Sequence, residues 1–213
     1  MNEVFENNTA VTKLRNFYVK YQKLIIVIFI LLAFLITAYV VNLQLEKKNN
    51  EQAAEIYNKW IAQEINTEEG KNASNEIFQE LTNSFPSSGY SMIALLNKAS
   101  IEAKAGNLDI SYEKFDQLKE MSDGFGGNKL FNKIARINLA RILYAKEEFD
   151  KALGVLDIYT GSTDALIHEL IGDILIKQDK KDLAIEQYDL AKQKYSSEAS
   201  ISIVSMKISN LAI

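Results

Sequence analysis

Apolar residues recur at helical spacing along most of the chain, and one continuous apolar run lies near its beginning. Residues 24–41 read LIIVIFILLAFLITAYVV and carry no charge. At about 1.5 Å per residue this run spans roughly 27 Å. Extension to Leu45 brings the length to that of a bilayer hydrocarbon core, roughly 30 Å. The pattern predicts one transmembrane helix over residues 24–45.

Two alternatives for this segment are a buried core helix and a cleaved signal peptide. No ionisable residue in the run opposes membrane insertion, which disfavours a core helix. A signal peptide has a shorter apolar stretch, of about 7–15 residues, followed by small residues at a cleavage site. Here the run is longer, and the bulky residues 39–44 (YVVNLQ) stand at its exit. We therefore expect an uncleaved anchor.

Lysine and arginine are unevenly distributed around the predicted anchor. The flank richer in these residues usually stays in the cytoplasm. We therefore expect a cytoplasmic tail over residues 1–23 and a translocated domain over residues 46–213, which in a Gram-negative cell is periplasmic. Residues 8–23 hold Lys13, Arg15, Lys20 and Lys23, whereas residues 42–57 hold Lys47 and Lys48.

The tail itself has an amphipathic pattern. Val11, Leu14, Phe17, Tyr18 and Tyr21 fall on one helical face, with basic residues between them. This pattern suits an interfacial helix or a surface for a cytoplasmic partner. A plain helical extension of the anchor, with its basic residues near lipid phosphates, explains the same residues.

Beyond residue 46 the helical pattern repeats. Residues 138–156 and 170–188 align at a spacing of 32 residues. Leu139-Ala140 and Ile171-Gly172 pair a large with a small residue in a first helix, and Ala152 and Ala184 supply a small residue in a second helix. This arrangement resembles the tetratricopeptide repeat, a helix pair whose close crossing admits only small side chains.

Further copies extend the array in both directions. Residues 92–121 form a weaker copy, with Ser111 in the place of the usual alanine, and residues 50–64 and 73–84 form the least regular pair. Ser111 lies 41 residues before Ala152, so the glycine-rich residues 122–128 are expected to lengthen an inter-repeat connection rather than to bind phosphate. We expect an all-α protein: an N-terminal transmembrane helix, then a tetratricopeptide-like α-solenoid of three to four helix pairs and a C-terminal capping helix.

Composition excludes several kinds of chemistry. The 213 residues include no cysteine, which removes disulfides, thiolate zinc sites and cysteine nucleophiles. A formal charge of −4 disfavours a nucleic-acid partner. The one histidine, His168, is expected to pack inside the last repeat. We expect no catalytic residue, no cofactor and no metal site, and therefore no enzyme. Acidic residues are expected to solvate and cap the turns and helix starts: Glu147, Glu148, Asp150, Asp179 and Asp182.

Stacked helix pairs curve, and their first helices line a concave face. Such a groove suits an extended segment or a helix of another protein. From the repeat alignment we expect the groove to be lined by Leu96, Ser100, Lys104, Ile137, Arg141, Tyr144, Glu169, Asp173 and Lys177.

The chain also resembles, from end to end, the YfgM type of protein, an ancillary subunit of the bacterial SecYEG translocon. The matching segments are residues 13–18 (KLRNFY), 139–141, 150–153, Gly172-Asp173 and 206–213 (MKISNLAI). The anchor is richer in isoleucine and leucine than the family's, and residues 46–90 match only in pattern.

The resemblance implies an inner-membrane protein beside the translocon. It would work with a membrane-anchored periplasmic chaperone of the PpiD type on newly translocated proteins. It would also contact a cytoplasmic stress-response regulator through the N-terminal tail. A repeat scaffold for another envelope process, such as cytochrome c maturation, would share the anchor and repeats but not the terminal run.

Overall fold

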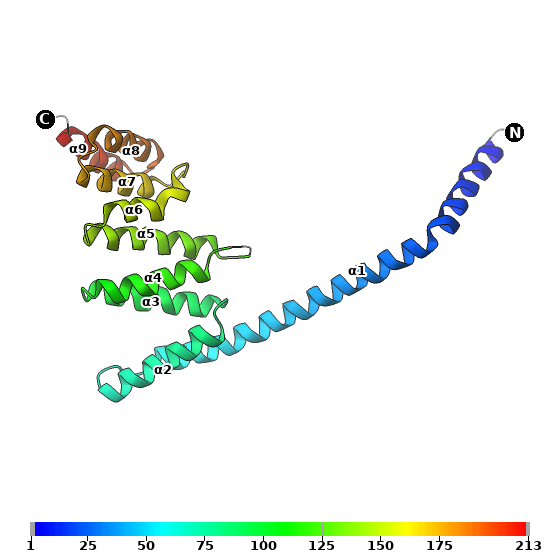
Figure 1. The fold of residues 1–213 in the computed structure, drawn as a ribbon, viewed down its shortest axis with the longest axis horizontal. Coiled ribbons are helices and arrows are strands. Elements are labelled where there is room, and N and C mark those ends of the chain that lie inside the picture. The colour runs from blue at the N-terminus through cyan, green and yellow to red at the C-terminus, as the bar shows by residue number, and fades with distance from the viewer. Residues whose placement is uncertain (1–2, 125, 212–213) are drawn as a thin grey trace. The chain divides into compact units, whose positions relative to one another are not determined.

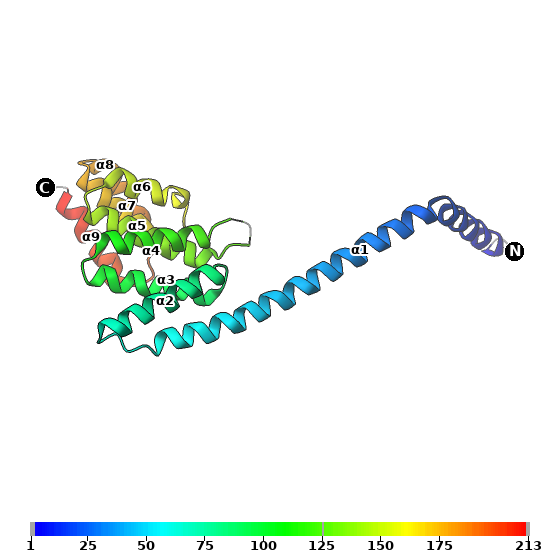
Figure 2. The ribbon, with the colours of Figure 1, turned by 60° about the horizontal axis from the view of Figure 1, so that its bottom comes forward.

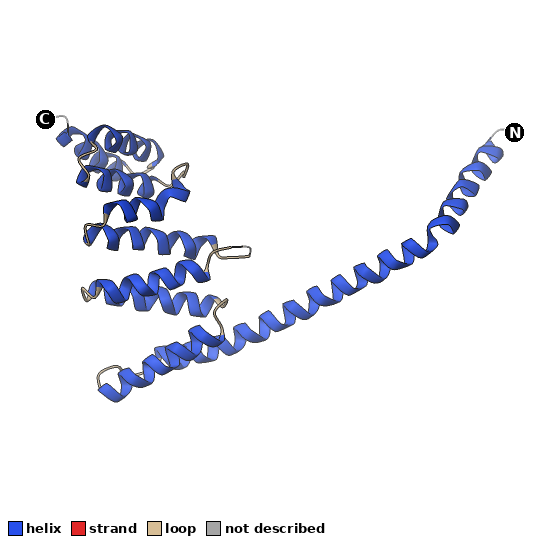
Figure 3. Ribbon diagram, in the orientation of Figure 1, coloured by secondary structure: helices blue, strands red, loops and turns tan. Residues whose placement is uncertain are grey.

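The computed structural model describes residues 3–124 and 126–211, with side chains from residue 11 onward. This part of the chain forms nine α-helices and one short 3-10 helix, and it contains no strand (Figure 3). The predicted terminal run at 206–213 therefore extends past the described residues, as does Phe125 of the predicted connection. The chain divides into two compact units, Met1–Gln52 and Ala53–Ile213.

The described part of the first unit belongs to one long helix. Helix α1 (Glu3–Ile61) has 59 residues and continues into the second unit. It is long because the first glycine and the one proline of the chain come only later, at Gly70 and Pro86. By length and composition α1 can cross a membrane, and its apolar window is not buried by any described part of the chain. The helix expected over residues 50–64 is not separate: residues 50–61 form the end of α1, and residues 62–64 belong to the connection that follows.

The second unit is a stack of antiparallel helix pairs (Figures 1 and 2). The end of α1 packs on its neighbours through aromatic rings, with centroids 5.7 Å apart for Trp60 and Phe78 and 5.6 Å apart for Tyr57 and Tyr90. The last helix packs on α8 as the cap. The predicted solenoid with a C-terminal cap is confirmed. Its elements are α2 (Glu68–Ser84), α3 (Gly89–Lys104), α4 (Leu108–Met121), α5 (Lys129–Ala145), α6 (Phe149–Leu156), η1 (Asp157–Tyr159), α7 (Ala165–Lys177), α8 (Lys181–Lys194) and α9 (Glu198–Leu211).

Small residues lie where the helices of a pair cross. Ala99, Ala140, Ala152 and Ala184 are fully buried, as the repeat alignment predicts. Ser111, which stands in the place of an alanine, is buried as well, and its hydroxyl donates a hydrogen bond of 2.8 Å to the carbonyl of Ala99. This bond satisfies the hydroxyl inside the core, which explains why serine is accepted there.

Gly172 marks the tightest of these contacts. A Cβ atom added to it would lie 2.5 Å from Cε1 and 2.7 Å from Cδ1 of Tyr188. The Tyr188 ring is 3% exposed, and its hydroxyl donates a hydrogen bond of 2.7 Å to Asp173. The ring therefore has little freedom to move aside. The small residue predicted for this position is required by the ring that packs against it.

The same type of turn joins the two helices within each of the last three pairs. Gly106, Glu147 and Asp179 occupy equivalent positions, with φ values of 82°, 61° and 58°. In each turn the next residue's N–H bonds to the carbonyl five residues earlier, at 2.9 Å in the first turn, 2.8 Å in the second and 3.0 Å in the third. This is the Schellman geometry, in which one residue takes the left-handed conformation that favours glycine. Two of the three turns use acidic residues there instead.

Candidate protein-binding face

The first helices of the three regular pairs are neighbours. Helix α3 contacts α5, and α5 contacts α7. We call the side of these helices that carries the nine predicted groove residues the first-helix face.

Three of the predicted residues are largely used by the fold. Ile137 is 7% exposed and belongs to the hydrophobic core. Leu96 is half-buried and packs against the core of the N-terminal pairs. The hydroxyl of Ser100 donates a hydrogen bond of 2.7 Å to the carbonyl of Leu96 within the same helix. These three side chains therefore mainly stabilise the helices of the face and offer little surface to a partner.

Glu169 and Asp173 are brought together by the last helix. The ammonium group of Lys207 in α9 lies 2.8 Å from Oε1 of Glu169 and 2.6 Å from Oδ1 of Asp173. The hydroxyl of Tyr195 donates a hydrogen bond of 2.6 Å to Glu169, and that of Tyr188 donates one to Asp173. Helix α9 therefore engages both predicted carboxylates, and one lysine neutralises much of their charge.

The ionisation of this network follows from its contacts. Burial raises the pKa of the Glu169 carboxyl, but hydrogen bonds from Lys207 and Tyr195 outweigh it, and the pKa lies below its ordinary value. Burial lowers the pKa of the Lys207 ammonium, but its bonds to Asp173 and Glu169 reverse this, and the pKa is raised. Burial and a carboxylate partner raise the pKa of Tyr188 and of Tyr195. Near neutral pH the lysine and Glu169 are both charged, and the tyrosines remain donors.

The remaining charged residues of the face are all cationic. Lys104, Arg141 and Lys177 are exposed, and none of them makes an ion pair with another described residue. Arg141 acts on Glu169 at longer range and helps to lower its pKa. Tyr144 is half-buried, with its ring centroid 5.8 Å from that of Phe149. The accessible part of the face thus offers three cations and the edge of an aromatic ring.

Residue-level prediction missed the contribution of α9. The inner face of α9 contains Val204, which is fully buried, and Ile208 and Leu211, which pack against the same core. Lys207 stands three residues after Val204, on the edge of that inner face. A lysine beside an apolar stripe was the available signal that a carboxylate lies opposite.

His168 has the packing role that the sequence predicts. It is 1% exposed. Its Nδ1 lies 2.8 Å from Oε1 of Gln187 and its Nε2 lies 2.9 Å from the carbonyl oxygen of Ser162. Both ring nitrogens are thereby engaged in fixing α7. Within the described residues, no three His, Cys, Asp or Glu side chains come together in a way that would hold a metal ion.

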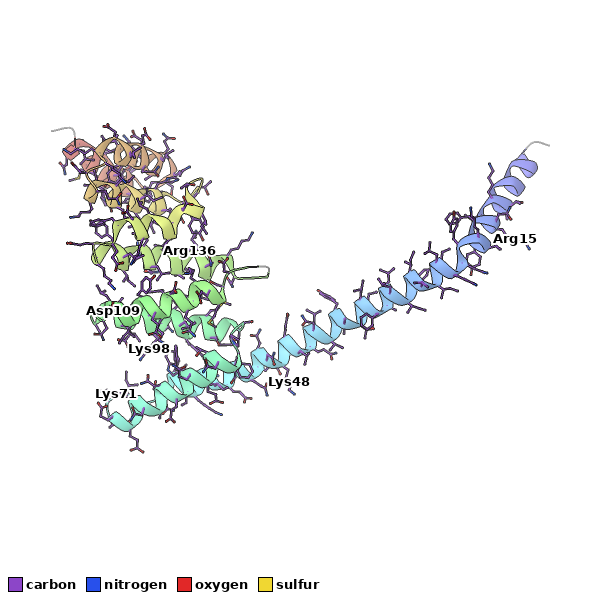
Figure 4. All side chains as sticks on the ribbon, in the orientation of Figure 1. Arg15, Lys48, Lys71, Lys98, Asp109 and Arg136 are labelled. Carbon is purple, nitrogen blue, oxygen red and sulfur yellow. The ribbon has the colours of Figure 1, made fainter. Side chains whose placement is uncertain are left out.

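The glycine-rich segment connects α4 to α5, as predicted. Gly124 and Gly126 have positive φ values, which the turn of this connection requires. Arg136, labelled on α5 in Figure 4, donates hydrogen bonds to Asn132 and to the carbonyl of Val155, and its guanidinium lies 3.4 Å from Asp123. These contacts fasten the start of the connection to the helices on both sides of it.

Comparison with known proteins gives the family. The model of the tetratricopeptide repeat-like domain matches residues 15–213. No protein of curated function matches the sequence. This fold is a protein-interaction fold and is generally not enzymatic. The matched range covers almost the whole chain, including most of the long apolar helix. The chain therefore belongs to the tetratricopeptide repeat-like domain family.

Proposed function

We propose that this protein is a membrane-anchored scaffold that holds other proteins on its first-helix face. The observation that carries the proposal is the set of exposed cations, Lys104, Arg141 and Lys177, which have no ion-pair partner among the described residues. Unpaired charges on one face of a protein-interaction fold favour a partner with complementary charge. The proposed partner is therefore a segment of another protein that bears carboxylates.

We further propose that the scaffold is an ancillary subunit of the SecYEG translocon. It acts there with a PpiD-type chaperone on newly translocated proteins. The support is the end-to-end resemblance to YfgM-type proteins. One part of the resemblance, the terminal run from Met206, includes Lys207, which joins α9 to α7. The proposal therefore draws on a segment that also fastens the capping helix to the last repeat.

The same proposal includes a topology: a cytoplasmic tail over residues 1–23, a membrane span over 24–45 and a periplasmic domain over 46–213. It is supported by the excess of lysine and arginine before the span. A reporter that is active only outside the cytoplasm, fused after residue 213, should be active. The mature protein should retain its N-terminal tail. Activity of a cytoplasmic reporter at that end contradicts the orientation, and a mature chain that begins near residue 40 contradicts the anchor.

Charge reversal tests the binding face. The double variant Lys104→Glu/Arg141→Glu replaces two cations of the face by carboxylates, which would repel the carboxylates that the partner is expected to carry. Loss of complementarity at a partly buried contact costs several kcal/mol of binding, about 2–5. Surface substitutions change folding stability by less, within about 0.5 kcal/mol. We therefore expect translocon and chaperone subunits to stop co-purifying with the variant while its circular dichroism stays unchanged.

A matched control separates the face from overall charge. Lys192→Glu/Lys194→Glu makes the same change in net charge on the second helix of the last pair, where both lysines are exposed. This control should keep the partners. Equal retention by both variants would mean that the first-helix face is not the contact. Recovery of proteins from a different envelope assembly process, in place of translocon subunits, would overturn the translocon assignment and leave the scaffold role.

A further inference from the structure

The part of α1 that precedes the predicted span is amphipathic. Val11, Leu14, Phe17, Tyr18 and Tyr21 project within an arc of about 120° of the helix. The first four are 64%, 73%, 58% and 56% exposed. The rings of Phe17 and Tyr21 pack together, with centroids 4.8 Å apart. This apolar stripe is covered by no other described part of the chain.

Basic residues stand at the borders of the stripe. At 100° per residue, Lys13 and Lys20 fall along one edge and Arg15 along the other. Residues 11–23 contain no Asp or Glu. The ammonium group of Lys20 lies 5.2 Å from the centroid of the Tyr21 ring. Long basic side chains at such a border keep their methylene groups on apolar surface while their charges reach anionic groups.

The helix also changes direction before the span. Figures 1 and 2 show the dark-blue N-terminal part of α1 turned away from the axis of the rest of the helix, and Figure 4 labels Arg15 on this turned part. The backbone remains helical throughout. A turned amphipathic helix that continues directly into a membrane span is able to lie along the membrane surface.

We propose that residues 11–23 lie in the headgroup layer of the membrane and bind phospholipids that carry a net negative charge. This inference rests on the membrane anchor of the proposed function. Two observations select lipid as the occupant: the stripe is continuous with the span, and the cations at its borders have no acidic residue beside them in residues 11–23. The apolar stripe faces the acyl chains, and Lys13, Arg15 and Lys20 contact the phosphates.

The absence of cysteine makes a direct test simple. The full chain is placed in lipid nanodiscs with one environment-sensitive bimane label, attached to Leu14→Cys on the stripe or to Asn16→Cys on the opposite side of the helix. Phosphatidylcholine discs are compared with discs that also contain phosphatidylglycerol. We expect iodide to quench the label at residue 14 several-fold less than the label at residue 16, and we expect the difference to grow with phosphatidylglycerol.

Two charge variants give the matched comparison. Lys13→Gln/Arg15→Gln/Lys20→Gln should remove the effect of phosphatidylglycerol on the label at residue 14. Lys47→Gln/Lys48→Gln, which removes cations on the other side of the span, should leave it. A chain that is retained in the discs but shows equal quenching at residues 14 and 16 overturns the inference alone and leaves the stripe to a protein partner. A chain that is not retained overturns the anchor, and the inference falls with it.

Discussion

The contact between Gly172 and Tyr188 leads to a prediction about folding stability. Replacing glycine by alanine should lower stability at residue 172 and raise it at residue 154. Gly172→Ala places a methyl group 2.5 Å from Cε1 of Tyr188, inside the repeat. The same change at Gly154, on the exposed side of α6, meets no atom within 4 Å. Both glycines lie in helices, so the two variants share the gain in helix propensity and differ only in packing.

The magnitudes follow from these two contributions. Replacing glycine by alanine inside a helix stabilises by about 1 kcal/mol. Overpacking a well-packed core costs about 1–3 kcal/mol. The Tyr188 ring cannot easily yield because its hydroxyl is held by Asp173 and the ammonium group of Lys207 lies 5.5 Å from its centroid. Gly172→Ala should therefore destabilise the repeat unit by about 1 kcal/mol, whereas Gly154→Ala should stabilise it by up to about 1 kcal/mol.

The assay is urea unfolding of residues 46–213, followed by circular dichroism, for the two variants and the parent. A second step adds Tyr188→Leu, which removes the ring that the new methyl group meets. The penalty of Gly172→Ala should then shrink or change sign, because the double variant relieves the clash. If Gly172→Ala and Gly154→Ala stabilise the unit equally, the close crossing described here is wrong.

Three further predictions concern the core, a turn and the cap. Ala184→Leu should overpack the crossing of α7 and α8, where Ala184 is fully buried, and lower the unfolding free energy by about 1–3 kcal/mol; an unchanged melting midpoint contradicts the repeat register. Glu147→Gly should raise stability by about 0.5–1 kcal/mol in the same denaturation assay, because Glu147 has a φ of 61°; a loss of stability contradicts this account of the turn. The pKa of Glu169 is below its ordinary value of 4.5, because the hydrogen bonds from Lys207 and Tyr195 outweigh the effect of burial. The contribution of Glu169 to folding stability is therefore complete above about pH 4.5 and is lost as the pH falls through the lowered pKa. Protection of the α9 amides from exchange, expressed relative to their intrinsic exchange rate at each pH, should fall in acid, and Glu169→Gln should flatten that dependence. An identical dependence in both proteins contradicts the linkage.

The repeat was predictable from the sequence because small residues recur at its 32-residue spacing. Ala152 and Ala184 stand at fixed offsets from the turns, and burial at a helix crossing admits few alternatives to such residues. Gly172 was expected to be small for the same reason. The tyrosine ring that makes the glycine necessary became visible only in three dimensions, because its contact depends on the angle between two helices.

The boundaries of the first pair were less predictable. Residues 50–64 have the amphipathic pattern of a repeat helix, and Trp60 does pack on Phe78. A periodic pattern does not show where a helix begins when no glycine, proline or cap separates it from the preceding segment. The anchor and the first repeat helix therefore appeared as two elements in the sequence and are one helix in the structure.

The candidate face shows the limit of the repeat alignment. Alignment assigns Leu96, Ile137 and Glu169 to one equivalent position, yet Ile137 is buried in the core and Glu169 is bound by Lys207. The difference arises because each copy has different neighbours: the pair of α5 and α6 lies between two other pairs, whereas the pair of α7 and α8 is followed by the capping helix α9. Equivalent positions share a direction on their helix, but their exposure is set by the next element in the stack.

The most direct test of the central claim is site-specific crosslinking in intact membranes. A photoreactive amino acid replaces Arg141 on the first-helix face or, as the control, Lys192 on the second helix of the last pair. The crosslinked proteins are identified by mass spectrometry. The account predicts crosslinks to translocon or chaperone subunits from residue 141 and few from residue 192. Crosslinks to those subunits from residue 192 and none from residue 141 would contradict it.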